Sequence, residues 1–220
     1  MSLISTYDLR LWMALEEGDK APNAKLSLIA QAVEDFVDSY TNRKLEAQRY
    51  LTDANFCYYD GMGKPYIYLK QYPVSYVSSV NQDVNRDFGS ATLFASGDYY
   101  WTPAGKVRLD SDSYWNYCGS GFAKGRRNIL VDFTAGYAPQ ALGGTYNASV
   151  SSYPIPSDLK QIMIEMCVES FKEGMTAVHS VAGPNVTEPK FIQMLRGNSF
   201  WSLTLNKYKA FDMMFDGRDE

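Results

Sequence analysis

The spacing of apolar residues changes twice along this chain of 220 residues, and this change constrains the fold more than any single motif. In residues 24–43 apolar side chains recur every three or four positions, which predicts one continuous helical face. These side chains are Leu26, Ile29, Val33, Phe36, Val37 and Tyr40. Residues 48–135 are instead rich in aromatic and β-branched residues, which favours strands. Helical spacing returns in residues 156–173. The sequence therefore predicts an α+β fold: a small helical bundle with an inserted antiparallel β region and a C-terminal extension.

Capping signals mark the two other predicted helices. Ser5 and Thr6 are good N-caps for a helix over residues 5–17, and Asp8 favours its N-terminus. Its expected apolar stripe is Leu9, Trp12, Met13 and Leu15. In residues 156–173, Pro156 suits the first helical position, where no N–H is needed. The expected buried face of that helix is Leu159, Ile162, Met163, Met166 and Cys167.

Glycines and turns divide the β region into strands. Residues 48–59 and 65–70 surround Asp60-Gly61-Met62-Gly63, which predicts a β-hairpin whose turn uses glycines at positive φ. A further strand is expected at residues 74–80, with Val74, Tyr76 and Val80 on one side. At least two more strands are expected within residues 97–110 and 127–133, and a polar, glycine-rich tip at residues 118–127 separates them.

The composition changes again after Gly174. Residues 175–190 contain Gly183, Pro184 and Pro189 and are typical of a linker, whereas residues 191–215 are strongly apolar. We therefore expect one domain over residues 1–174, followed by a linker and docking extension over 175–220. A hydrophobic segment after such a linker is typical of a docking peptide, although it can also fold back on the domain.

The charge balance limits the partners that this chain can bind. Its 21 basic and 25 acidic side chains give a formal net charge of −4, which argues against wrapping nucleic acid. This charge balance is compatible with a protein that DNA passes without being bound. Lys124, Arg126 and Arg127 lie in the predicted tip and are candidates for contact with an acidic partner or a DNA backbone.

Residues capable of catalysis or metal binding are few. Cys57, Cys118 and Cys167 lack metal-ligand spacing, and His179, the one histidine, lies in the predicted linker. We therefore expect no metal and no cofactor. The acid pairs Asp110/Asp112 and Asp98/Asp132 would suit a glycosidase only if both carboxyl groups faced one cleft. Aspartates at strand ends more often cap turns, so we expect no enzyme activity.

Neither a secretory signal nor a membrane span is evident in the sequence. The first residues lack the basic stretch and apolar run of a signal peptide. No 18 apolar residues occur together, so no membrane helix is expected. The odd number of cysteines fits a reducing cytoplasm.

Five short phrases occur in a fixed order after the first helical region: YDGMG at 59–63, YPVSYVSSV at 72–80, GDYY at 97–100, VDFTAGY at 131–137 and IPSDLK at 155–160. This order resembles the head-tail connector (adaptor, or head completion) proteins of tailed bacteriophages, and the resemblance covers roughly residues 3–173. No single phrase is diagnostic. The extended C-terminus and the long loops at 81–96 and 138–153 depart from the shorter members, which leaves siphophage, myophage and podophage origins open.

The resemblance implies a structural, non-enzymatic role in the virion neck. The chain would form a ring of roughly twelve copies beneath the portal protein and continue the DNA channel toward a tail-side stopper, neck or hub protein. By analogy, the C-terminal segment would hold the portal, and the β region would contact the tail-side component. The expected portal contacts are Phe191, Ile192, Met194, Leu195, Phe200, Trp201, Leu203 and Leu205. The alternative is a carbohydrate-binding or glycan-cleaving phage protein, which exposed tryptophans and tyrosines clustered on one sheet face, or a carboxylate pair in a cleft, would favour.

Overall fold

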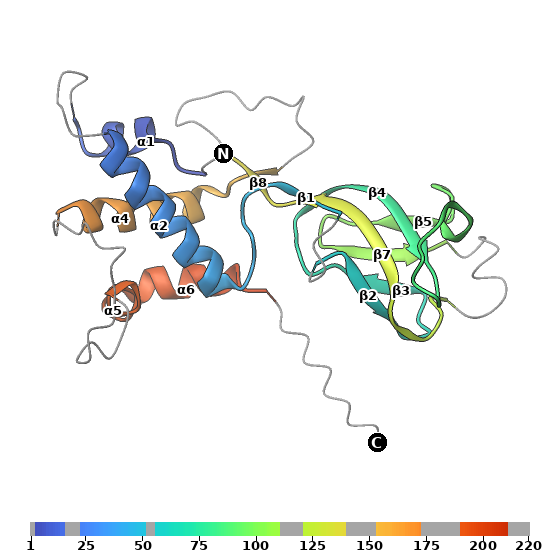
Figure 1. Cartoon of the computed structure of the whole chain (residues 1–220). Helices are drawn as coiled ribbons and strands as arrows, with labels where there is room; N and C mark the ends of the chain where they lie inside the picture. The colour runs from blue at the N-terminus through green and yellow to red at the C-terminus, as the bar shows by residue number, and fades with distance from the viewer. Residues whose placement is uncertain are drawn as a thin grey trace. The chain divides into compact units, whose positions relative to one another are not determined.

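The computed structural model describes residues 3–15, 23–51, 56–110, 121–139, 153–172 and 190–210. The chain forms two compact units. A β unit comprises Lys44–Ile155, and a helical unit comprises Ser2–Arg43 together with Pro156–Glu220 (Figure 1). The predicted α+β class is confirmed, because the β unit is inserted between the two sequence segments that build the helices.

The helical unit contains five described helices: α1 (Thr6–Trp12), α2 (Asn23–Thr41), α4 (Ser157–Lys172), α5 (Lys190–Gly197) and α6 (Ser199–Lys207). The Ser5 side chain accepts from the backbone N–H of Asp8, and the Asp8 side chain accepts from that of Ser5, so Ser5 is the N-cap of α1. Helix α1 ends five residues before the predicted boundary, and Ala14 beyond it has φ 50°. The predicted bounds of α2 and α4 agree within two residues.

Leucine, isoleucine, valine and methionine side chains fill the interior of the helical unit. Helix α2 packs against α4. From α2 the buried apolar side chains are Leu26, Ile29, Ala30, Ala32, Val33 and Val37. From α4 they are Leu159, Ile162, Met163, Ile164, Met166 and Cys167. Every member of the face predicted for residues 156–173 is therefore buried.

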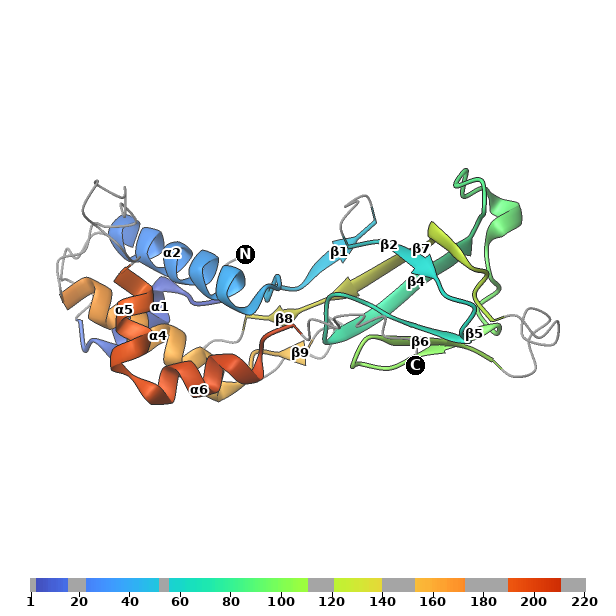
Figure 2. The same ribbon diagram turned by 90° about the horizontal axis from the view of Figure 1, so that it is seen from below.

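The C-terminal helices α5 and α6 belong to this same compact unit, whereas the sequence placed them in an extension beyond residue 174. Helix α6 contacts both α2 and α4 (Figure 2). Trp201 is 7% exposed and Leu205 is fully buried. The physical reason is the apolar character of α5 and α6, whose Leu195, Trp201 and Leu205 side chains cover the bundle of this same chain.

Polar contacts also fix α1 and α6 to α4. The carboxylate of Asp8 lies 3.0 Å from the Lys160 ammonium, and both side chains are buried. The indole N–H of Trp201 donates to Glu165 at 2.8 Å, and the Tyr208 hydroxyl donates to Asp158 at 2.6 Å. These contacts join residues from the two ends of the sequence.

In the β unit, the long strand β7 (Gly125–Ala135) organises the larger sheet. It pairs antiparallel with β1 (Gln48–Tyr50), β2 (Tyr58–Gly61) and β4 (Val74–Gln82). A second antiparallel sheet has the order β3 (Tyr66–Tyr68), β6 (Lys106–Leu109), β5 (Tyr99–Trp101). The remaining elements are the short helix η1 (Ser90–Thr92) and a parallel pair, β8 (Tyr137–Ala138) with β9 (Tyr153–Pro154).

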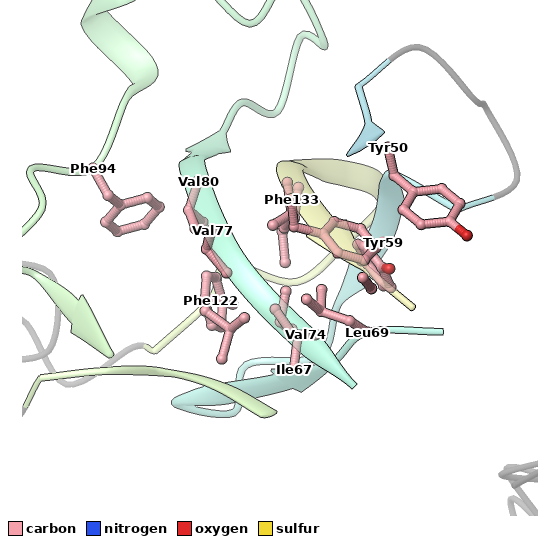
Figure 3. Close-up of a cluster of buried hydrophobic side chains, with 14 of the residues drawn as sticks. Tyr50, Tyr59, Ile67, Leu69, Val74, Val77, Val80, Phe94, Phe122 and Phe133 are labelled. Atoms are coloured by element: carbon pink, nitrogen blue, oxygen red, sulfur yellow. The ribbon is translucent and has the colours of Figure 1, made fainter. Parts of the chain in front are cut away.

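One apolar cluster joins residues of both sheets. Ile67, Val107 and Leu109 come from the smaller sheet, and Val77, Val131 and Phe133 from the larger. Tyr50 stacks on Phe133 with 5.0 Å between ring centroids (Figure 3). The core therefore consists almost entirely of aliphatic and aromatic side chains.

Two details of the β prediction are wrong. The expected hairpin does not form, because β2 pairs with β7 whereas β3 pairs with β6. Gly63 has φ 74°, as a tight turn requires, but Gly61 serves close packing, since a Cβ there would lie 1.8 Å from the Ala123 carbonyl oxygen. In β4 the buried apolar side chains are Val74, Val77 and Val80, and Tyr76 is 55% exposed, because irregularities in the pairing with β7 change the alternation.

Candidate interaction surfaces

The outer face of the smaller sheet presents three tyrosines and two cations. Strand alternation directs Ile67, Val107 and Leu109 into the core. Their neighbours therefore lie on the opposite face: Tyr66, Tyr68, Tyr100, Lys106 and Arg108. We call these five residues the tyrosine–cation face. Tyr66 and Tyr100 are both registered with Arg108, and Tyr68 with Lys106.

The side chains of this face contact one another. The Lys106 ammonium lies 4.7 Å from the centroid of the Tyr66 ring and 5.8 Å from that of Tyr68. The two tyrosine rings meet edge to face at 5.6 Å, and the Arg108 guanidinium lies 6.0 Å from the Tyr100 ring. Tyr68 and Tyr100 remain 42% and 47% exposed. The face is therefore an ordered and accessible arrangement of aromatic and cationic groups.

A second basic surface lies where β7 begins. Lys124, Arg126 and Arg127, which the sequence singled out, are all exposed there. The Arg127 guanidinium lies 5.0 Å from the Tyr58 ring, and its backbone N–H donates to Asp60. Asn128 holds this region, since its amide accepts from Gly61 N–H and donates to the Ala123 carbonyl, both at 2.8 Å. Of the expected tip, residues 118–120 lie outside the described part of the chain.

The eight expected portal-contact residues do not share one environment. Leu195, Trp201 and Leu205 are buried within the helical unit, whereas Phe200 and Leu203 are 53% and 66% exposed. Ile192 and Met194 are half-buried, and the Phe191 side chain lies outside the described residues. Among the described members, Phe200 and Leu203 are the most accessible to a partner, because the buried three already cover the helical core.

A further apolar surface on the helical unit was not identified from the sequence. Tyr7 and Leu11, one turn apart on α1, are 61% and 56% exposed, and Trp12 is 47% exposed. On α2, Leu28 is 55% exposed. The expected stripe on the first helix is therefore wrong at Trp12, while Leu9 is buried as expected. The packing of α1 explains the miss, because the residues that it buries are Asp8 and Leu9.

The acidic residues considered for catalysis have structural partners. Both oxygens of Asp132 bind the Arg49 guanidinium, one of them at 2.8 Å from Nε. This carboxylate raises the pKa of Arg49 by hydrogen bonding and by charge. Asp98 accepts from the Ala95 N–H at 2.9 Å, as expected for a turn. Asp112, Cys118 and His179 lie outside the described residues.

Other reactive groups lie in apolar surroundings. Cys57 and Cys167 are buried thiols, and burial raises the pKa of Cys167.

Within the described ranges, no three His, Cys, Asp or Glu side chains gather as metal ligands. No helix in the part of the chain described here has the length and apolar character of a membrane span.

The sequence matches no protein-family model and no curated protein. The fold is similar to solved structures from gene transfer agent (GTA) particles. One is a chain in the neck of an empty GTA particle computed with C6 symmetry, with 16% identity and a TM-score of 0.56 over 99% of this chain and 94% of that chain. A chain from the virion of the native particle has 15% identity and a TM-score of 0.53 over 94% and 90%. A chain from the native neck computed with C12 symmetry has 14% identity and a TM-score of 0.51 over 97% and 94%. At these identities the similarity establishes the fold, and it spans both units.

Proposed function

We propose that this chain is a structural protein of the neck of a tailed-phage-like particle. In this role it forms a ring beneath the portal protein, continues the DNA channel to the tail, and has no enzymatic activity. The observation that carries the proposal is the similarity over 99% of the chain to a protein in a GTA neck. The five phrases of the sequence point to the same class of protein. The chain would act in the virion, after folding in the cytoplasm of the bacterial host.

The ring we propose contains twelve copies. Support comes from the neck structures, which were computed with C6 and C12 symmetry. Cyclic assemblies close through repeated contacts between identical subunits. The tail-side face of the ring would hold a stopper, neck or hub protein, and the β unit supplies an exposed sheet surface for such contacts.

For the portal contact we propose the outward side of α6. Phe200 and Leu203 are exposed there, while Trp201 and Leu205 fix the helix to the bundle. Large apolar side chains in water are a source of binding energy, about 1.5 to 3 kcal/mol for each one fully buried. The anchor would thus be a helix face rather than a free peptide.

Mixing purified chain with purified portal protein tests the proposal. We expect the chain alone to be monomeric or a small oligomer and to form rings when portal is added, as mass photometry would show. Phe200→Ser/Leu203→Ser should weaken co-assembly. Leu28→Ser, a change at a similarly exposed leucine of α2, is the matched control. Absence of co-assembly at micromolar concentration would contradict the proposal.

DNA passage is the second part of the role. With a net charge of −4, the ring would let duplex DNA slide past, because few counterions are released on contact. A gel-shift assay near physiological salt should show no retardation. Tight, salt-dependent binding that Lys124→Glu/Arg126→Glu abolishes would instead identify a DNA-binding protein.

One observation favours the carbohydrate-binding alternative: exposed tyrosines do cluster on one sheet face. Against it, Lys106 lies over the rings of Tyr66 and Tyr68, where a sugar ring would stack. Titration with host surface polysaccharide distinguishes the two functions. Binding that Tyr68→Ala and Tyr100→Ala remove would support the alternative.

A further inference from the structure

We propose that the end of the β unit at which β7 begins binds an acidic segment of a second protein. The site consists of five exposed cationic side chains, which we call the five-cation cluster: Lys64, Arg86, Lys124, Arg126 and Arg127. The sequence singled out three of them, and the fold adds Lys64 and Arg86. The inference deepens the proposed function, on which it rests only for the identity of the partner, the tail-side protein of the neck.

Contacts between two segments hold Lys64 beside Lys124. The backbone N–H of Phe122 donates to the carbonyl of Lys64 at 3.0 Å. The Lys124 side chain lies against the neighbouring turn, since a Cβ added at Gly63 would be 3.1 Å from its Cε. Phe122 is fully buried, and its ring centroid lies 5.9 Å from that of Phe94 (Figure 3). The apolar core therefore fixes the backbone from which both lysines project.

The loop after β4 brings Arg86 to the same end. Phe88 of this loop contacts the Tyr58 ring, with 5.5 Å between centroids, and the Arg127 guanidinium lies 5.0 Å from the same ring. Within the described ranges five non-glycine residues have positive φ, and three of them lie here: Arg86, Phe88 and Arg127. Such backbone conformations are unfavourable for residues with a side chain, and they cluster at binding sites. The fold thus maintains a strained arrangement around these cations.

Most of these cations have no carboxylate partner in the part of the chain that the structure describes. No salt bridge among those residues includes Lys64, Arg86, Lys124 or Arg126. Their ammonium and guanidinium groups are exposed at one end of one unit. Complementary charges across an interface orient the partners and exclude wrong ones, so the partner of this end is an anion.

The nearby carboxylates do not neutralise the cluster. Residues 58–64, 82–88 and 121–128 contain five cations against three carboxylates, a net charge of +2. Asp83 already accepts from three backbone N–H groups of its own loop. Asp60 accepts from the backbone N–H of Arg127. The third carboxylate, that of Asp87, is exposed.

These carboxylates favour a protein partner over duplex DNA. Asp60 and Asp87 are exposed beside the cations and would repel phosphates, which are closely and regularly spaced along a duplex. A protein segment can instead place single carboxylates opposite single cations. It can also contact the half-buried rings of Tyr58 and Phe88, and tyrosine and arginine are enriched at protein interfaces. The cluster therefore fits an acidic protein segment.

The cluster lies far from the points at which the chain enters and leaves the β unit. The entering strand β1 is registered with the C-terminal end of β7, where Gln48 lies opposite Ala135. Strand β7 has 11 residues, and at about 3.3 Å per residue it spans roughly 33 Å. The two connections to the rest of the chain therefore do not cover the cluster.

Poly-L-glutamate labelled with fluorescein is the probe, because it presents carboxylates on a polypeptide. Fluorescence anisotropy measures its binding to the full chain at low ionic strength, where exposed charges are least screened. Lys124→Glu/Arg126→Glu should weaken binding by roughly tenfold. Lys106→Glu/Arg108→Glu makes the same change in net charge on the tyrosine–cation face and should leave binding within about twofold. Equal losses in the two variants, or no binding by the wild-type chain, would overturn the inference.

A second double variant tests whether separate segments form one site. Lys64→Glu/Arg86→Glu changes the two cations that only the fold places here, and it should also weaken binding by roughly tenfold. Full binding by this variant would contradict the cluster.

Backbone amide NMR spectra locate the bound probe and show whether each variant remains folded. Addition of poly-L-glutamate should shift resonances in residues 60–64, 84–88 and 123–128. Shifts confined to the tyrosine–cation face would overturn the inference. Duplex DNA that binds more tightly than poly-L-glutamate at the same salt concentration, and loses binding in the same variants, would assign the cluster to nucleic acid instead.

Because these experiments contain no portal protein, their outcome is independent of the portal assay. Poly-L-glutamate binding as expected without portal co-assembly would retain the acidic partner and reject the neck role. Portal co-assembly without poly-L-glutamate binding would retain the neck role and reject the five-cation cluster as a binding site.

Discussion

The helical unit and the β unit differ in which parts of the sequence build them. Residues near the two ends of the sequence build the helical unit, and buried polar contacts such as Asp8 with Lys160 join them. A continuous segment builds the β unit, whose core is aliphatic and aromatic. A substitution that destabilises one unit should therefore be distinguishable, by hydrogen exchange, from a substitution that destabilises the other. The comparison also shows that Trp201 and Leu205 of the C-terminal segment are part of the helical core of this chain.

Truncation after Gly174 should have the largest effect. It removes Leu195, Trp201 and Leu205 from the helical core, a loss of roughly 5 kcal/mol or more at about 1.5 to 3 kcal/mol for each side chain. That is comparable to the whole stability of a small domain. Hydrogen exchange should show α2 and α4 losing protection while β7 keeps it. A truncated chain with fully protected α2 and α4 would contradict this packing.

Asp8→Ala should destabilise the helical unit by about 3 to 5 kcal/mol, because it removes the carboxylate that pairs with the buried Lys160 ammonium and caps the start of α1. Urea unfolding followed by circular dichroism measures the loss. The double change Asp8→Leu/Lys160→Met removes both charges, so its cost should be smaller. Equal costs for the single and double variants would refute this explanation.

Phe133→Ala is the corresponding test in the β unit. Phe133 is fully buried and stacks on Tyr50, and truncation of such a side chain costs about 3 to 5 kcal/mol. Exchange protection should fall in β4 and β7 and remain in α2. If both units lose protection together, they fold as one cooperative body and the comparison fails.

The smallest expected effect concerns the loop after β4. Asp83 accepts backbone hydrogen bonds from Asn85, Asp87 and Phe88, and the bond from Asn85 is the largest cause of its lowered pKa. The folded pKa of Asp83 lies below its unfolded pKa of about 3.9. These hydrogen bonds to the carboxylate are therefore fully present at pH values above about 3.9. They are lost as the pH falls through the folded pKa. The Asn85 amide resonance should shift in that acidic range, and Asp83→Ala should abolish the shift.

Local signals in the sequence predicted α2 and α4 within two residues and the start of α1, but residues 191–215 were not predicted to contain the helices α5 and α6. The capping pair Ser5 and Asp8 and the periodic face of α2 involve contacts within a few residues, so their physics is visible in sequence. The strand at Val74–Gln82 was found for the same reason. The pairing of β2 with β7 was missed, because their residues lie about 70 positions apart and local turn chemistry favoured the nearer partner.

Candidate surfaces were harder to predict than elements. An apolar face indicates burial but not what covers it, so Trp201 and Leu205 were assigned to a partner although their own bundle buries them. Lys124, Arg126 and Arg127 were correctly placed in one exposed region, because they are adjacent in sequence. The tyrosine–cation face combines three separate strands and becomes visible only when their register is known.

Cryo-electron microscopy of the chain bound to purified portal protein tests the central claim most directly. The account predicts a cyclic ring on the tail-side face of the portal, with density for one helical unit and one β unit in each subunit and an open central channel. A portal without added density, or density bound at one site without cyclic symmetry, would contradict the neck role.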